Sequence, residues 1–140
     1  YHTCALVAGA GVKCWGRNSS GELGNGSTAN SHTPADVSGL TSGVRAIAAG
    51  GNHTCALTGG GEAFCWGEGQ SGQLGDGGKG DHPKPFAVTG GLTFSSISAG
   101  EGYTCGMARG QAYCWGKNDK GQLGITETTP KTAPEPVGGE

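Results

Sequence analysis

Cys65-Trp66-Gly67, followed shortly by Gly72-Gln73-Leu74-Gly75, is the pattern on which the architecture rests. The pattern occurs in three copies, and in each copy an earlier cysteine precedes it. The first copy consists of Cys4, Cys14-Trp15-Gly16 and Gly21-Glu22-Leu23-Gly24, the second begins at Cys55, and the third consists of Cys105, Cys114-Trp115-Gly116 and Gly121-Gln122-Leu123-Gly124. Cys14, Cys65 and Cys114 are therefore 51 and 49 positions apart. A repeat of this length indicates one structural unit that was copied and that stacks against its neighbours.

The composition favours short strands and many turns. Glycine accounts for 31 of the 140 residues, and only 34% of the chain is hydrophobic. Apolar residues do not recur at helical spacing, whereas short apolar runs at 44–48 and 63–66 lie between glycine clusters. We therefore predict an all-β protein.

The second copy is the most complete and predicts four short strands, at 44–49, 53–57, 63–66 and 85–88. Four strands per repeat is the content of a propeller blade. The other copies align with it, so we predict a single region with repeats at approximately 1–40, 41–91 and 92–140. The first repeat lacks its leading strand and the last stops before another begins. We therefore expect an incomplete or open propeller, and a chain that is a mature product, a fragment or a protomer completed by other copies.

The charge pattern argues against nucleic-acid and membrane partners. The formal net charge is -2, and lysine and arginine form no cluster of the kind that nucleic acids or anionic membranes require. The uncharged stretches are too polar to span a bilayer, and the chain opens at Tyr1 without a signal peptide. We expect no nucleic-acid binding and no membrane insertion.

The six cysteines are most simply paired within each copy. Cys55 and Cys65 face each other across a predicted hairpin whose turn is centred on Gly59-Gly60-Gly61, and glycine readily adopts the positive φ that a reversal needs. In the third copy the turn shortens to Arg109-Gly110, which still leaves its two cysteines opposite each other. The expected disulfides are Cys4–Cys14, Cys55–Cys65 and Cys105–Cys114.

Two other interpretations of the cysteines stay open. A zinc site needs closely paired ligands, and His2 and His53 could join the cysteines of their copies, but the third copy has Tyr103 at that position. Free buried thiols are the second alternative. Disulfides imply an oxidising compartment, so we expect a secreted, extracellular or cell-surface protein.

Strand alternation places large rings opposite small residues on the hairpin face away from the disulfide. Trp66 pairs with Thr54, and Trp115 pairs with Thr104, which leaves a slot for a neighbouring blade. The residues that we expect to pack blades together are Trp15, Trp66, Trp115, Leu23, Leu74 and Leu123.

The stretches His53-Thr54-Cys55-Ala56-Leu57, Cys65-Trp66-Gly67 and Gly72-Gln73-Leu74-Gly75-Asp76-Gly77 resemble the repeat of the RCC1 (regulator of chromosome condensation) family over essentially the whole chain. The resemblance implies a β-propeller, typically seven-bladed, whose members are exchange factors, inhibitors, photoreceptor domains and interaction platforms. The chain is most similar to the cysteine-containing version of secreted and cell-surface proteins. It departs from the pattern at Ile125-Thr126, where the family has Asp-Gly, and at Gly69, where the other copies have asparagine.

No motif predicts catalysis, a metal or a cofactor. His2 and His53 recur with the repeat, which favours structural hydrogen bonding, while His32 and His82 lie in variable loops before a proline, where a solvated role is expected. The glycine-rich loops lack the phosphate-binding pattern, and the loops that contain Asn25 or Asp76 lack the further carboxylates of a calcium site. We expect a protein that is not an enzyme.

Three sequences fit the N-glycosylation pattern, at Asn18, Asn25 and Asn52. Asn18 and Asn25 are expected in an exposed loop and are the better candidates for attached glycans, whereas Asn52 adjoins a strand.

The favoured function is protein binding or scaffolding through the loops that differ between copies, 27–33, 78–84 and 125–132. The alternative is a structural subunit that assembles head to tail into a ring or filament, so that further copies of the chain are the partner. An inhibitor of a secreted enzyme and a nucleotide-exchange regulator are weaker alternatives.

Overall fold

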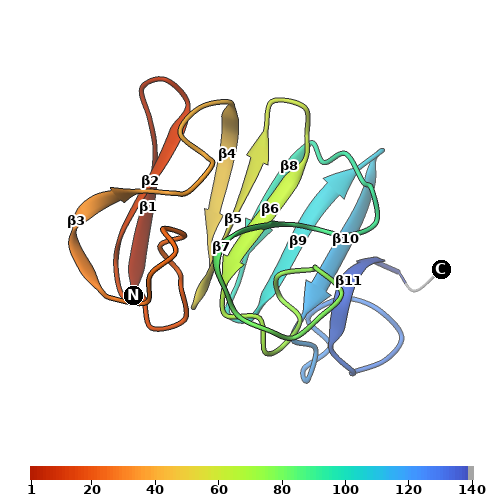
Figure 1. The fold of residues 1–140 in the computed structure, drawn as a ribbon. Helices are drawn as coiled ribbons and strands as arrows, with labels where there is room; N and C mark the ends of the chain where they lie inside the picture. The colour runs from red at the N-terminus through yellow and green to blue at the C-terminus, as the bar shows by residue number, and fades with distance from the viewer. Residues whose placement is uncertain (139–140) are drawn as a thin grey trace.

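The computed structural model describes residues 1–138, which form three antiparallel sheets (Figure 1). The strands are β1 (His2–Val7), β2 (Gly11–Gly16), β3 (Ser31–Asp36), β4 (Val44–Ala49), β5 (His53–Thr58), β6 (Ala63–Gly67), β7 (His82–Ala87), β8 (Ser96–Ala99), β9 (Tyr103–Ala108), β10 (Gln111–Gly116) and β11 (Lys131–Pro136). Strands that follow one another in the chain are neighbours within each sheet. The prediction of an all-β propeller-like fold is confirmed.

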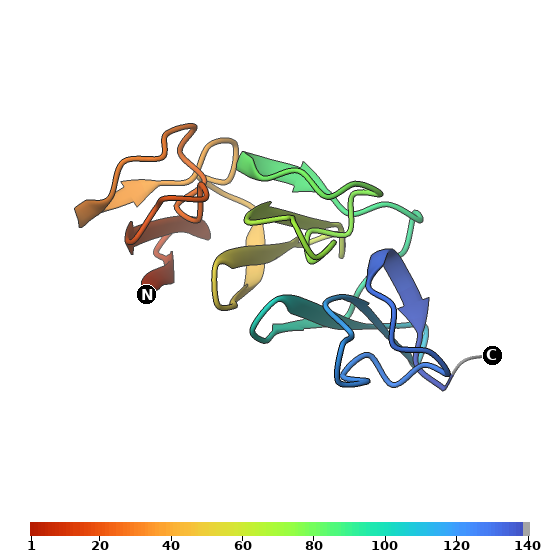
Figure 2. The same ribbon diagram turned by 90° about the horizontal axis from the view of Figure 1, so that it is seen from below.

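The three sheets stand side by side in chain order, as both views show (Figures 1 and 2). The first sheet is β1-β2-β3, the second is β4-β5-β6-β7, and the third is β8-β9-β10-β11. Each main contact between strands of neighbouring sheets involves a leading strand: β4 lies against β1 and β8, and β8 also lies against β5. Each sheet is therefore one blade.

The outer strand of the second blade begins earlier than the sequence predicts. It was expected at 85–88 but runs as β7 from His82 to Ala87, because Gly67 pairs with His82 and Cys65 with Phe86 across a register shift. Pro83 and Pro85 cannot donate ladder hydrogen bonds, and an edge strand tolerates this because only one side of it is paired. The edge position of β7 thus accommodates both prolines.

One disulfide closes the hairpin of each blade, as predicted. Cys4–Cys14, Cys55–Cys65 and Cys105–Cys114 are bonded, with Cα–Cα distances of 4.1 Å, and each pair is directly opposite in its ladder. The shortened turn of the third blade has positive φ at both Arg109 (53°) and Gly110 (76°). Two such residues suit the right-handed twist of a hairpin, which keeps the cysteines in register.

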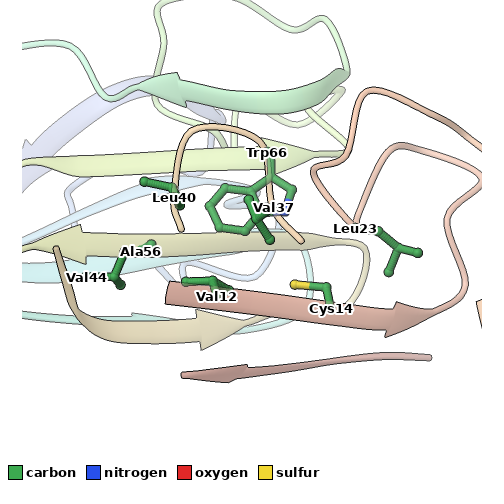
Figure 3. Packing of buried hydrophobic residues seen from close by; sticks show 8 residues of the cluster. All are labelled: Val12, Cys14, Leu23, Val37, Leu40, Val44, Ala56 and Trp66. Atoms are coloured by element: carbon green, nitrogen blue, oxygen red, sulfur yellow. The ribbon is translucent and has the colours of Figure 1, made fainter. Parts of the chain in front are cut away.

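The hydrophobic core lies between blades. One cluster joins Val12, Leu23 and Val37 of the first blade to Ala56 and Trp66 of the second (Figure 3). The second cluster repeats it one blade further on. Its members include Leu57, Leu74, Phe94, Ala108 and Trp115. Trp66 and Trp115 are buried against the preceding blade, which agrees with the predicted stacking of blades.

The blade-packing residues differ in burial according to what covers them. Leu23, Leu74 and Leu123 are buried, and so are Trp66 and Trp115. Trp15 is only half-buried, and its cross-strand neighbour Thr3 is exposed, because no loop of the described residues lies over this face. The packing role predicted for Trp15 is therefore not filled within this part of the chain.

Shortening a leucine of the repeated tetrad should destabilise the fold strongly. We expect Leu74→Ala to lower the free energy of unfolding by about 2–5 kcal/mol, because Leu74 is fully buried between blades. Urea unfolding under oxidising conditions measures this. The matched control is Leu6→Ala, whose side chain is 41% exposed and should cost less than about 1 kcal/mol. Equal losses in the two variants would contradict an inter-blade core.

Candidate functional site: the loop face and the blade junctions

The long loops and the short inter-strand turns meet at one end of the blades. Ala49 pairs with Thr54, His53 with Gly67, and Gly67 with His82, so the segments 50–52 and 68–81 leave the second sheet at the same end. The other blades place 17–30, 100–102 and 117–130 there as well, at the lower side of the sheets in Figure 1. We call this end the loop face. It carries most of the variable segments predicted to bind partners, but residues 31–33, 82–84 and 131–132 of those segments lie in β3, β7 and β11 and not in loops.

A buried asparagine holds the loop of the first blade. The Asn18 Oδ1 atom accepts a hydrogen bond from Leu23 N (2.9 Å), and its Nδ2 group donates to the carbonyls of Ser27 (2.8 Å) and Ala29 (2.9 Å). Asn118 of the third blade makes the same three bonds, to Leu123 N and to the carbonyls of Glu127 and Thr129. These bonds were not predicted from the sequence in either blade. The side chains of Asn18 and Asn118 are thus the internal framework of their loops.

The expected exposure of Asn18 is wrong. Asn18 is fully buried, and both the oxygen and the nitrogen of its side-chain amide are hydrogen-bonded within the loop. Attaching a glycan to this nitrogen would break the loop framework. Asn25 is half-buried, with its Oδ1 accepting from Ser27 N (3.1 Å), and Asn52 is also half-buried. Glycosylation of Asn25 and Asn52 stays a prediction.

Gly69 gives the second blade a different loop. The Asp81 carboxylate accepts from Gly69 N (2.9 Å), as Asn30 accepts from Asn18 N in the first blade (2.8 Å). A Cβ atom at position 69 would lie 2.1 Å from the carbonyl oxygen of Gly80. The backbone of the loop thus occupies the space that an asparagine side chain fills in the other copies.

The tetrad of each blade docks onto the tryptophan of the next blade. The carbonyl oxygen of Glu22 accepts hydrogen bonds from Thr54 Oγ1 (3.0 Å) and from Trp66 Nε1 (2.9 Å). Gly24 lies against the same ring, where a Cβ atom would be 2.7 Å from Trp66 Nε1, so only glycine permits this approach. Gly26 N donates to the carbonyl of Pro83 (2.9 Å), which ties the loop to the outer strand of the next blade.

The second junction matches the first except at the tryptophan, because Trp115 Nε1 is buried without a hydrogen-bond partner. The carbonyl oxygen of Gln73 accepts from Thr104 Oγ1 (2.8 Å), and a Cβ atom at Gly75 would be 2.6 Å from Trp115 Nε1. Gly77 N donates to the carbonyl of Thr132 (2.8 Å). The carbonyls of Glu22 and Gln73 were missed by the sequence reasoning, although their place in a repeated tetrad was a usable signal.

The histidines of the repeat complete the junctions. His2 Nε2 lies 2.8 Å from Thr54 Oγ1, and His53 Nε2 lies 2.8 Å from Thr104 Oγ1. Because each threonine hydroxyl donates its proton to a carbonyl, it must accept from the histidine Nε2–H group. The Nδ1 atoms of both histidines are buried without a hydrogen-bond partner. The structure therefore gives both rings the structural hydrogen bonding expected from their repetition.

Burial keeps the junction histidines neutral. Desolvation, together with a smaller contribution from the neighbouring His2, lowers the pKa of His53 from its usual 6.5 to about 4. Burial also lowers the pKa of His2, against an opposing attraction from the Glu22 carboxylate. Both junctions are thus built for the uncharged imidazole.

The other two histidines lie at the surface. His32 is exposed. His82 Nε2 contacts Asp76 Oδ2 (2.6 Å), and its ring stacks on Phe86 with centroids 4.6 Å apart. The Asp76 carboxylate also accepts from Gly78 N (3.1 Å), so it serves the turn of its own loop. The pairing of His82 with Asp76 was not foreseen from the sequence.

Neither a metal centre nor a membrane-spanning helix is found in the part of the chain that the structure describes. Among residues 1–138, histidine, cysteine, aspartate and glutamate do not gather in groups of three or more that suit a metal ion. In the same residues, no helix has the length and apolar character needed to cross a bilayer.

Comparison with known proteins agrees with this architecture. The family model for the regulator of chromosome condensation (RCC1) repeat matches residues 12–57, 60–107 and 109–140. The chain belongs to the RCC1 repeat family. The first match starts in β2 and ends in β5, so a single RCC1 sequence repeat spans a blade junction.

The RCC1 relatives are longer proteins. The chain is 35% identical to the Arabidopsis thaliana ultraviolet-B receptor UVR8 over 106 residues, covering 74% of the chain and 24% of UVR8. It is 39% identical to human protein RCC2 over 89 residues, covering 62% of the chain and 17% of RCC2. The chain thus spans a quarter or less of the length of these two relatives.

Solved structures with the same fold include one human and one yeast protein. Human WBSCR16 is 25% identical with a TM-score of 0.85, over 97% of this chain and 37% of that protein. Prp20p from Saccharomyces cerevisiae is 24% identical with a TM-score of 0.83, over 97% of this chain and 36% of that protein. The blades of this chain are therefore superimposable on about a third of each of these structures.

Acid should weaken the blade junctions through His53. An unfolded chain takes up a proton near pH 6.5, whereas folded His53 resists protonation down to about pH 4, so the free energy of unfolding should fall as the pH is lowered across this window, by up to about 3 kcal/mol. His53→Gln keeps an N–H donor but does not titrate, so its stability should fall less steeply. Urea unfolding at pH 7, 5.5 and 4.5 measures the difference.

The control for this experiment is His32→Gln, which changes an exposed histidine. It should follow the wild-type pH dependence. A His53→Gln profile parallel to the wild type would contradict the role of burial at the junction.

Proposed function

We propose that this RCC1-like protein is a non-catalytic protein-binding module that contacts its partner through the loop face. The observation that carries the proposal is the convergence of three dissimilar loops on one end of a repeated frame, with two of them fixed internally by Asn18 and Asn118. Binding proteins commonly present variable loops on a rigid scaffold. Family membership supports the proposal, since Prp20p has been characterised for its binding to Gsp1p and histones.

The variable loops differ in chemistry as well as in sequence. The segment 27–33 is uncharged apart from His32, and 78–84 carries Lys79, Asp81 and Lys84. The segment 125–132 carries Glu127, whose carboxylate contacts Lys131 Nζ (2.7 Å). Three neighbouring blades thus offer a partner three different surfaces, which is a route to specificity.

We also propose an extracellular setting, of the cysteine-containing secreted type. The support is the use of all six cysteines in disulfides, with the Cys55–Cys65 bridge fully buried at a blade junction. Such bonds persist in oxidising compartments. In that setting Asn25 and Asn52 are the acceptors for glycans, and inhibition of a secreted enzyme is one form that binding would take.

A second candidate function is self-assembly. The specific observation is the first-blade face that carries half-buried Trp15 and exposed Thr3, the positions that match Trp66 and Thr54. In the other two blades the Gly-x-Leu-Gly loop of the preceding blade covers these positions. A loop of the same kind from a further copy of the chain would cover Trp15, so light scattering over a range of concentrations, with Trp15→Ala as comparison, tests this candidate.

Exchanging matched loop segments should move binding without affecting stability. We expect replacement of Ser27-Thr28-Ala29 by Glu127-Thr128-Thr129 to reduce partner capture at least tenfold, because both segments span the same asparagine-held loop and differ in exposed side chains. The measurement is cross-linking of the purified oxidised protein to proteins of its native fluid or extract, quantified by mass spectrometry. Thermal unfolding should be unchanged within about 2 °C.

The control is Ala8→Glu, which adds one carboxylate to the exposed turn between β1 and β2 at the opposite end of the blade. It should leave capture unchanged. If Ala8→Glu reduces capture as much as the loop exchange, or if the loop exchange has no effect on any captured protein, the loop face is not the binding surface.

A further inference from the structure

The loop face contains a polar cleft that runs along the blade junctions. It consists of two adjoining hollows of about 140 and 370 Å³, which share Gly51, Asn52 and Glu101. Glu68, Ser71, Gly102 and Lys117 complete the smaller hollow, and Tyr1 and Arg17 complete the larger one. The cleft therefore runs across all three blades.

Two kinds of segment build the cleft. The turns 50–52 and 100–102 join the first two strands of the second and third blades. Arg17, Glu68 and Lys117 each follow the Trp-Gly pair at the end of a hairpin, so they are the same position of the repeat in three different copies. Tryptophan, glycine and leucine are constant between the copies, whereas this position changes from basic to acidic to basic.

The charged side chains of the cleft are not neutralised by one another. Among residues 1–138, Glu68, Glu101 and Lys117 make no ion pair within 4.0 Å, and Arg17 pairs only with Glu22 at 3.9 Å. Glu101 lies over the neighbouring turn, where a Cβ atom at Gly51 would be 3.1 Å from its Cγ. Glu101 thus lines both hollows.

Buried polar residues support the walls of the cleft. Gln73 is fully buried, accepts from Ser71 N (2.9 Å) and donates to Glu68 Oε2 (3.1 Å), so the Glu68 carboxylate is held from behind. The corresponding residue of the first blade is Glu22, which is also fully buried. Its Oε2 has no hydrogen-bond partner and faces Arg17 Nε. The buried Glu22 carboxylate thus partly neutralises the charge of Arg17. In the smaller hollow the two carboxylates of Glu68 and Glu101 outnumber the one ammonium group of Lys117, so its net charge is negative.

We propose that the smaller hollow binds a cationic side chain, arginine before lysine, presented by a protein partner between Glu68 and Glu101. This inference rests on the proposed binding function and assigns the partner's chemistry at the loop face. A guanidinium group has planar N–H donors that match two carboxylates, and the hollow is of the size of one such head group with part of its stem. Lys117 lines the same hollow, so an acidic residue next to the bound arginine would meet its ammonium group.

Model peptides provide the test. The probes are acetyl-Gly-Arg-Gly-amide, its citrulline analogue and acetyl-Gly-Glu-Gly-amide, titrated into the oxidised full chain and followed by amide chemical shifts. We expect millimolar binding of the arginine peptide, with shifts at Gly51, Asn52 and Gly102, and at least fivefold weaker binding of the other two peptides. Raising the salt concentration should weaken the binding, because the site is open to solvent.

Two single substitutions and one control locate the site. Glu68→Gln and Glu101→Gln should each weaken binding of the arginine peptide about fivefold, whereas Lys117→Gln should leave it unchanged or tighten it. Glu62→Gln, at an exposed turn on the opposite end of the second blade, should have no effect. Thermal unfolding of each variant shows that it folds.

Two results would overturn the inference: equal binding of the arginine and citrulline peptides, and binding that is insensitive to both Glu68→Gln and Glu101→Gln. Preference for the glutamate peptide would also overturn it and would assign the cleft to Arg17 and Lys117. If loop exchange still abolishes partner capture in that case, the proposed binding function stands and only the cationic pocket fails. If neither responds, both fail.

Discussion

The fold depends on one backbone carbonyl at each blade junction. The carbonyl oxygen of Glu22, presented by a tetrad loop, receives the hydroxyl of Thr54 and the indole N–H of Trp66, and the carbonyl of Gln73 receives Thr104. These bonds form in a fully buried setting, where an unmet polar group is costly. They fix the position of each loop on the next blade, and the apolar contacts of the leucines and tryptophans follow from that placement.

The junctions separate the constant parts of the repeat from the variable parts. The disulfide closes each hairpin, the tetrad joins hairpins to one another, and Asn18 or Asn118 fixes the base of a loop. The side chains beyond these points differ between the three copies. This arrangement explains how a glycine-rich chain, whose core lies between its blades, presents a defined surface of loops and charges.

Much of the fold was predictable because the chain repeats itself. The pairing of Thr54 with Trp66, the three disulfides and the turn at Arg109-Gly110 all follow from the register of a copied hairpin. The burial of Asn18 was not predicted, because a glycosylation pattern is local whereas its amide bonds reach across the loop to Ala29. Asn118, in the same position without that pattern, was the signal of a structural role. The approach of Glu101 to Gly51 depends on stacking, which a single copy does not encode.

The central claim is that the threonine-to-carbonyl bond holds the blades together, and isosteric removal of the hydroxyl tests it most directly. Urea unfolding of Thr54→Val, Thr104→Val and Thr3→Val compares the same repeat position in three blades, with Thr3 exposed and without a loop above it. The first two substitutions should each lower the free energy of unfolding by about 1–3 kcal/mol. Each leaves a histidine N–H without its acceptor and removes the threonine hydroxyl bond to a buried carbonyl. Thr3→Val should change it by less than about 0.5 kcal/mol. Equal effects at all three positions would contradict the claim.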